Sequence, residues 1–118
     1  MTIKRLVGVY DADGTVRGEL AYLLGRARGT AHCALCDITH GRLRRRADFD
    51  AASEQLAVPL QLCHRDEIDE TVRLAANGRF PCVVAVGTDG AWVVMDRDDL
   101  DACDSDPAAL VERLNAAV

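Results

Sequence analysis

Four residues with thiol or imidazole side chains fall within nine positions of this 118-residue chain: His32, Cys33, Cys36 and His40. Two thiols separated by two residues can close a disulfide or bind one metal ion together. His40 follows Cys36 by four residues, about one helical turn, and so can reach the same centre. A plainer interpretation is that the two cysteines are small buried core residues, because free cysteine is often buried.

One interpretation of this stretch is thiol–disulfide redox chemistry, in which one thiol attacks a substrate disulfide and the other resolves the mixed disulfide. In Cys-x-x-Cys motifs the first thiol is usually the exposed one with a lowered pKa, so Cys33 is the expected attacker and Cys36 the expected resolver. His32 and His40, when protonated, would favour the thiolate, and Asp37 would oppose it. The partner would be a protein that carries a thiol or a disulfide.

The alternative is a non-catalytic zinc site. Cys33, Cys36 and His40 provide three ligands, and a closed zinc site needs a fourth. Cys63 or His64, at the end of a predicted strand, is the natural supplier, because strand ends of an α/β sheet point toward the crevice where ligands collect.

Two further cysteines lie outside both of these candidate sites. Cys82 lies in the most apolar strand and is expected to be core, or a neighbour of the site through Pro81. Cys103 lies in a polar, acidic stretch and is expected to be exposed.

Length and composition favour one globular domain over residues 1–118, with a hydrophobic core of its own. The net charge of −5 argues against general binding to nucleic acid. No apolar run reaches 18 residues, so no membrane span is expected. The first five residues run directly into a strand-like segment with no room for a signal peptide, so we expect the reducing cytoplasm. Cysteines in that compartment suggest reactive or metal-binding thiols more than a disulfide framework.

Four of the five residues 42–46 are arginines, beginning with Arg42. Such a run can bind a phosphate or an acidic partner. More often it is a solvated face, and the sequence leaves the two alternatives open.

The elements that must position these residues alternate between strands and helices. Apolar runs and turn residues predict four strands, over residues 3–10, 58–62, 82–86 and 91–95, with Thr88-Asp89-Gly90 as the turn between the last two. Capping residues and apolar spacing predict helices that follow Thr15, Asp48, Asp66 and Asp106. Residues 96–101 are expected to form a loop or a short helix. Pro107 is expected at the first position of the last helix, with Leu110, Leu114 and Ala117 on its buried face.

This order of elements resembles the thioredoxin-like fold, in which a cis-proline opens the first strand of the hairpin. Phe80-Pro81-Cys82 stands at that point here, so the Phe80–Pro81 bond is expected to be cis. The resemblance implies a central mixed sheet of about four strands with helices on both faces, and oxidoreductase activity at a Cys-x-x-Cys beside the proline. The chain departs from the family pattern because Asp13-Gly14-Thr15-Val16 occupies the place directly after the first strand, and Cys33 and Cys36 come after the following helix.

A second, local resemblance involves residues 6–16. They resemble the first motif of the haloacid dehalogenase superfamily of phosphatases, an apolar strand that ends in Asp-x-Asp-Gly-Thr. By that resemblance Asp11 would be the nucleophile and Asp13 the general acid and base, with a magnesium ion beside them. Asp98 and Asp99 would stand for the final acidic motif. The family's downstream lysine has no counterpart, because the only lysine is Lys4.

Overall fold

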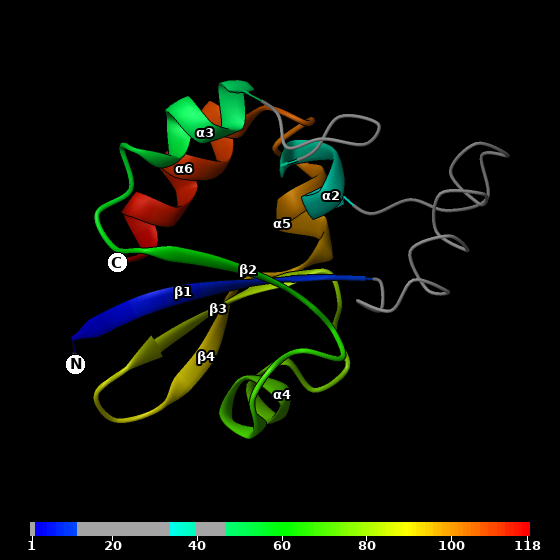
Figure 1. Ribbon diagram of the computed structural model, residues 1–118, viewed down its shortest axis with the longest axis vertical. Helices are drawn as coiled ribbons and strands as arrows, with labels where there is room; N and C mark the ends of the chain where they lie inside the picture. The colour runs from blue at the N-terminus through cyan, green and yellow to red at the C-terminus, as the bar shows by residue number, and fades with distance from the viewer. Residues whose placement is uncertain (1, 12–33, 40–46) are drawn as a thin grey trace, which may run out of the picture.

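The computed structural model describes residues 2–11, 34–39 and 47–118 (Figure 1). The predicted helix after Thr15 lies outside these described residues. In the helix at 34–39, the side chains of Ala34, Cys36 and Asp37 are also outside the description.

Four strands form one open mixed sheet. They are β1 (Ile3–Tyr10), β2 (Leu60–His64), β3 (Cys82–Gly87) and β4 (Ala91–Met95), in the spatial order β2-β1-β3-β4. β1 pairs parallel with β2 and antiparallel with β3, and β3 pairs antiparallel with β4. The predicted α/β class and four-stranded mixed sheet are therefore confirmed.

The described helices are short and lie on both faces of this sheet (Figure 1). They are α2 (Ala34–Thr39), α3 (Ala47–Ser53), α4 (Glu70–Ala76), α5 (Arg97–Asp101) and α6 (Pro107–Ala117). Because side chains of a strand alternate between the two faces, the apolar residues of β1 serve two cores.

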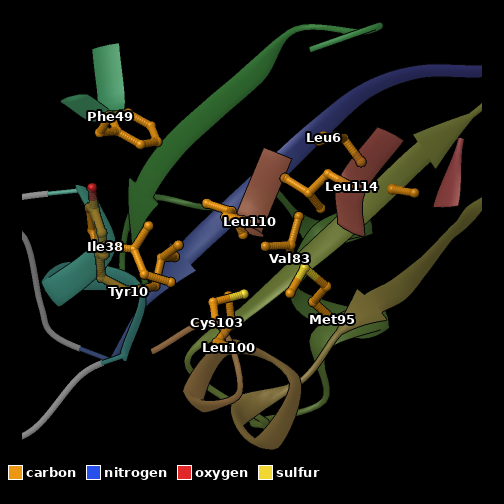
Figure 2. Close-up of a cluster of buried hydrophobic side chains, with 12 residues drawn as sticks. Leu6, Tyr10, Ile38, Phe49, Val83, Met95, Leu100, Cys103, Leu110 and Leu114 are labelled. Carbon is orange, nitrogen blue, oxygen red and sulfur yellow. The ribbon is translucent and has the colours of Figure 1, made fainter. Parts of the chain in front are cut away.

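The larger core lies between the sheet and the helices α2, α3, α5 and α6 (Figure 2). Its fully buried side chains include Leu6 of β1, Leu35 and Ile38 of α2, and Leu110 and Leu114 of α6. The smaller core lies on the opposite face, where Val7, Val9, Cys63 and Cys82 pack with Val72 and Ala76 of α4. The helices follow from this burial more than from helix propensity, because segments of five to eleven residues do not form stable helices alone.

Helix capping agrees with the sequence at α6 and differs at the start of α4. Asp106 caps α6 and Pro107 opens it, as predicted. Asn77 ends α4 in the left-handed conformation, with φ of 50°. The N-cap of α4 is Asp69 and not the predicted Asp66: its carboxylate accepts a hydrogen bond of 2.9 Å from the backbone N–H of Val72. Asp66 lies in the turn that directly follows β2, three residues before Asp69 and too early to reach those amides.

The acidic stretch after β4 forms the short helix α5, in which Asp96 and Asp99 make a reciprocal capping box. Cys103 follows α5 directly, and its exposed fraction is only 2%. The prediction that Cys103 is exposed is therefore wrong: its side chain lies beside Leu100 in the larger core (Figure 2), while its charged neighbours face solvent. Ala117 is exposed, so the buried face of α6 ends at Leu114.

The Phe80–Pro81 peptide bond is cis, as the sequence predicts, and Pro81 is buried directly before β3. Cys82 has no exposed surface, which confirms that it is a core residue. In the part of the chain that the structure describes, no helix has the length and apolar character needed to span a bilayer.

Gly8 of β1 lies where the sheet, β2 and α2 approach one another. A Cβ atom at this position would lie 3.0 Å from Leu62 Cδ2 and 3.2 Å from Leu35 Cδ2. We expect Gly8→Val to lower the free energy of unfolding by about 1–3 kcal/mol, because it overpacks this contact. Gly8→Ala should cost less, since the two leucine methyl groups can shift. Urea denaturation measures both variants, and a Gly8→Val variant as stable as the wild type would contradict the close approach of α2 to β1.

Candidate functional site

The carboxyl ends of β1 and β2 and the beginning of β3 meet at one edge of the sheet. Tyr10 pairs in register with His64, and Val9 with Cys82. The residues that follow or precede these pairs, Asp11, Arg65 and Phe80-Pro81, therefore gather at the same place. We refer to this edge, with Arg97 from α5, as the strand-end site.

α2 packs against the strand-end site through buried side chains. Leu35 and Ile38 have no exposed surface, and Thr39 is the one fully buried polar residue among those described. The hydroxyl groups of Thr39 and Tyr10 form a buried hydrogen bond of 2.9 Å. This bond joins the last residue of α2 to the last residue of β1, and α2 also contacts α5.

The predicted chemical residues are only partly described. Cys36 lies within α2, so its backbone is placed but its side chain is not described. His32, Cys33, His40, Asp13 and the arginine run 42–46 lie outside the described residues. The thiol groups of Cys33 and Cys36 thus both lie outside the described part of the chain.

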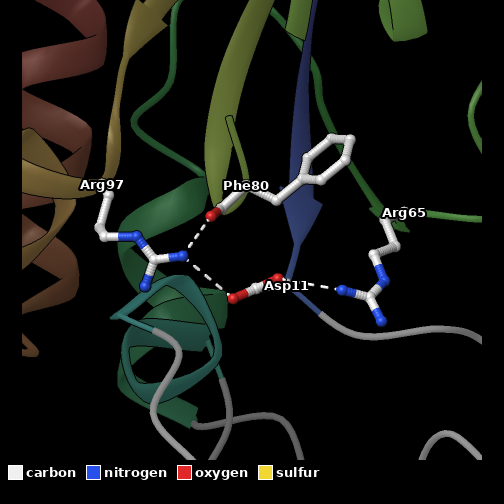
Figure 3. A network of polar contacts seen from close by, with 4 residues as sticks. All are labelled: Asp11, Arg65, Phe80 and Arg97. Carbon is white, nitrogen blue, oxygen red and sulfur yellow. Dashed lines mark hydrogen bonds and ion pairs between the residues drawn. The ribbon is translucent and has the colours of Figure 1, made fainter. Parts of the chain in front are cut away.

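Asp11 lies at the centre of a polar cluster at the strand-end site (Figure 3). Arg65 Nη1 lies 3.2 Å from Asp11 Oδ1, and Arg97 Nη2 lies 3.0 Å from Asp11 Oδ2. The same Arg97 nitrogen donates to the backbone carbonyl of Phe80. The sequence did not predict either arginine as a residue of the site. Each follows closely after a strand, but only the strand order brings them together.

This cluster bears on the phosphatase alternative, in which Asp11 attacks a phosphate. Both carboxylate oxygens of Asp11 are engaged by guanidinium groups. A magnesium ion would compete with these guanidinium groups for the same oxygens, since it binds carboxylate oxygens directly.

His64 is held by Glu67 three residues later. Glu67 Oε1 lies 2.6 Å from His64 Nδ1 and also accepts a hydrogen bond of 2.9 Å from the backbone N–H of His64. Two hydrogen bonds lower the pKa of Glu67: the one from this backbone N–H has the larger effect, and the one from the His64 ring has the smaller. Because Glu67 is then a carboxylate at neutral pH, Nδ1 of His64 must carry the proton that it donates. The ring also contacts the ring of Tyr10, with centroids 5.4 Å apart.

Cys63 and His64, the two predicted candidates for a fourth zinc ligand, face opposite sides of the sheet. Cys63 belongs to the smaller core with α4, whereas His64 contacts Tyr10, which belongs to the larger core with α2. Among the residues that the structure describes, no group of three histidine, cysteine or acidic side chains is arranged to bind a metal ion.

The three described cysteines are all buried free thiols. Burial raises the pKa of Cys82 to about 11, and it also raises the pKa values of Cys63 and Cys103. A thiol with a raised pKa is a poor nucleophile at neutral pH, because the thiolate is the reactive form. These three residues are therefore poor candidates for reactive thiol chemistry.

A groove of about 480 Å³ lies between α3 and β2. Its lining is mostly apolar and includes Phe49, Leu56, Val58 and Leu60. None of the described residues that line it carries a charge.

Comparisons of the chain with protein-family models, with curated proteins and with solved structures find no match. We therefore infer function from the residues and their geometry.

The hydrogen bond between Tyr10 and Thr39 gives a first test of the site. We expect Tyr10→Phe to lower the free energy of unfolding by about 0.5–1.5 kcal/mol, because it removes one buried hydrogen bond and keeps the ring. Thr39→Val should have a similar effect, and the double variant should lose less than the sum of the two. Urea denaturation measures all three, with Thr88→Val as an exposed control. Fully additive effects would show that the two hydroxyl groups do not interact.

Glu67 gives a test by pH. Since its pKa is lowered in the folded state, its contribution to stability is present above the unfolded pKa of about 4.3 and is lost as the pH falls through the folded value. We expect Glu67→Gln to remove part of the loss of stability on acidification below about pH 4.3. Urea denaturation at several pH values measures this, with the exposed Glu54→Gln as the matched control. Identical pH profiles for Glu67→Gln and the wild type would contradict the contact with His64.

Proposed function

We propose that this domain carries out thiol–disulfide exchange through Cys33 and Cys36 on a thioredoxin-like fold. The observation that carries the proposal is the packing of α2 at the strand-end site. Leu35, Ile38 and Thr39 anchor α2, and the Cys-x-x-Cys motif begins immediately before this anchored helix. Cys36 thus belongs to a helix whose last residue is hydrogen-bonded to the last residue of β1.

The strand order supports the thioredoxin-like assignment. β1, β2, β3 and β4 form a central mixed sheet of four strands with helices on both faces, as this resemblance implies. Directly after β1 the chain has Asp11, bound to Arg65 and Arg97, where the family has its reactive thiols. In this chain the proposed reactive pair comes instead from the start of α2, with Cys33 directly before the helix and Cys36 in its first turn.

In the proposed reaction the thiolate of Cys33 attacks one sulfur of a substrate disulfide. A mixed disulfide forms, and the other substrate sulfur leaves as a thiolate that takes up a proton. The thiolate of Cys36 then attacks the Cys33 sulfur, releases the second substrate thiol and closes the Cys33–Cys36 disulfide. Two electrons pass from the dithiol to the substrate, so the domain is oxidised as the disulfide is reduced.

A zinc site is the second candidate, favoured by the contact between His64 and Glu67. Histidines that bind metals generally donate their other ring N–H to a carboxylate or carbonyl group, and Glu67 holds His64 in this way. Because His64 lies on the α2 face and Cys63 on the α4 face, His64 is the preferred fourth ligand beside Cys33, Cys36 and His40.

A trapping experiment tests the redox proposal. Mild oxidant should join Cys33 and Cys36 in a disulfide, and reductant should reopen it, because two intervening residues allow the sulfur atoms to reach bonding distance. Cys36→Ser should trap a mixed disulfide on Cys33. Peptide mapping after alkylation of the remaining thiols identifies the bonds. Cys103→Ser is the matched control, because this buried thiol has a raised pKa and should take no part.

Metal analysis of protein purified without chelator separates the two candidates. One zinc ion per chain with protected thiols would contradict the redox proposal, and His64→Ala should then weaken zinc binding more than Cys63→Ala. Metal-free protein in which Cys33 and Cys36 are always alkylated and never joined would contradict both candidates, and would leave the two cysteines as core residues.

A further inference from the structure

We propose that Arg97 is a positioning residue for the thiol chemistry of Cys33 and Cys36, because it links two of the elements against which α2 packs, β1 and α5. This inference rests on the proposed function and assigns a role to a residue outside the thiol motif. Arg97 does not touch the reacting sulfur atoms in this proposal, and it acts through the placement of α2.

α2 contacts four described elements, β1, α5, α3 and α6, and the first two support it at the strand-end site. On the β1 side, the Tyr10 hydroxyl group bonds to Thr39 at 2.9 Å. On the α5 side, Leu100 is fully buried in the same core as Leu35 and Ile38. The position of α2 therefore depends on how β1 and α5 are placed relative to each other.

Arg97 joins these two supports. It is the first residue of α5, and its guanidinium group lies 3.0 Å from Asp11 Oδ2, one residue beyond the end of β1 (Figure 3). The same nitrogen donates to the carbonyl of Phe80, so one side chain ties together β1, α5 and the segment before β3. Arg65 engages the other oxygen of Asp11 and so restricts how the carboxylate can turn.

The link is close to both supports of α2 along the chain. Tyr10 directly precedes Asp11, and Leu100 follows Arg97 by three residues, almost one helical turn.

The side chains of Arg97 and Asp11 are 49% and 29% exposed, and ion pairs this accessible contribute little to global stability. Loss of Arg97 should therefore change the placement of α2 more than it changes the unfolding of the whole domain.

Arginine suits this role because its planar guanidinium group presents several N–H donors in fixed directions and can bind two acceptors at once. Lysine keeps the charge but lacks the fixed geometry. Arg97→Lys should therefore retain part of the function that Arg97→Gln loses.

The experiment compares Arg97→Gln with Arg97→Lys by two measurements. The first is amide hydrogen exchange of α2, which reports local opening of the helix. The second is the rate at which the dithiol, after reacting with 5,5′-dithiobis(2-nitrobenzoic acid), closes its own disulfide and releases the second thionitrobenzoate. Arg97→Gln should speed amide exchange in α2 and slow the closing step about tenfold, as a small displacement of reacting groups does. Arg97→Lys should fall between Arg97→Gln and the wild type.

Arg5→Gln is the matched control, because it breaks another partly exposed arginine–aspartate pair, Arg5–Asp69 at 3.1 Å, on the side of α4. It should leave both measurements as in the wild type. Asp11→Asn should act as Arg97→Gln does, and the two changes combined should add little to either one, if Arg97 acts through Asp11.

Amide exchange in α2 that is the same for Arg97→Gln and Arg5→Gln would overturn the proposal. Faster amide exchange with an unchanged closing step would also overturn it, because α2 placement would then not govern the thiol chemistry. A wild-type protein that never closes the disulfide would overturn the proposed function and the positioning role with it, whereas the amide exchange would still report whether α2 depends on Arg97.

Discussion

The hydrogen-bonded pairing of β1 on both of its edges is the constraint on which the rest of this structure depends. β2 pairs with one edge of β1 in parallel and β3 with the other in antiparallel orientation, and the second part of β1, from Leu6 to Tyr10, is buried throughout. Its side chains alternate between two cores, with Leu6 and Tyr10 on one face and Val7 and Val9 on the other. The same pairing brings the ends of three strands together at one edge, where the polar residues of the candidate site accumulate.

Burial gives the three described cysteines a structural role. Cys63, Cys82 and Cys103 are enclosed by apolar side chains, and the loss of hydration disfavours their thiolates. A small polarizable side chain fills these positions much as alanine or valine would. These three cysteines therefore give little support to a redox function. The proposed function depends on Cys33 and Cys36, the pair that is close in sequence.

Much of the fold could be predicted from local sequence patterns, because those patterns reflect burial and chain reversal directly. The strand over residues 3–10, the hairpin at Gly90 and the start of the last helix at Pro107 each depend on residues that are neighbours in the chain. The α4 cap was misplaced because Asp66 and Asp69 are chemically identical, and only the path of the chain after β2 decides which one meets the helix amides. Cys103 was misjudged because its polar neighbours hide a side chain that turns inward after a short helix.

The candidate site could be predicted only where its residues are close in sequence. The Cys-x-x-Cys motif is visible in a window of four residues, and His64 is visible as a strand end. The cluster of Arg65, Arg97 and Asp11 joins residues up to 86 positions apart, and no local pattern marks that encounter. Charges that follow strands indicate candidates, but the order of the strands decides which of them meet.

β2 is an edge strand of the sheet, and its edge determines how readily copies of this domain associate at high concentration. Within the described residues β2 pairs on one side only, so its other edge presents backbone groups that could join another strand. The strand is only five residues long, Pro59 precedes it without a backbone N–H, and Arg65, Asp66 and Glu67 follow it with charges. A strand this short, bounded by a proline and by charged residues, offers few backbone groups for pairing with another molecule. The residues at the two ends of β2 therefore disfavour edge-to-edge association of the sheet.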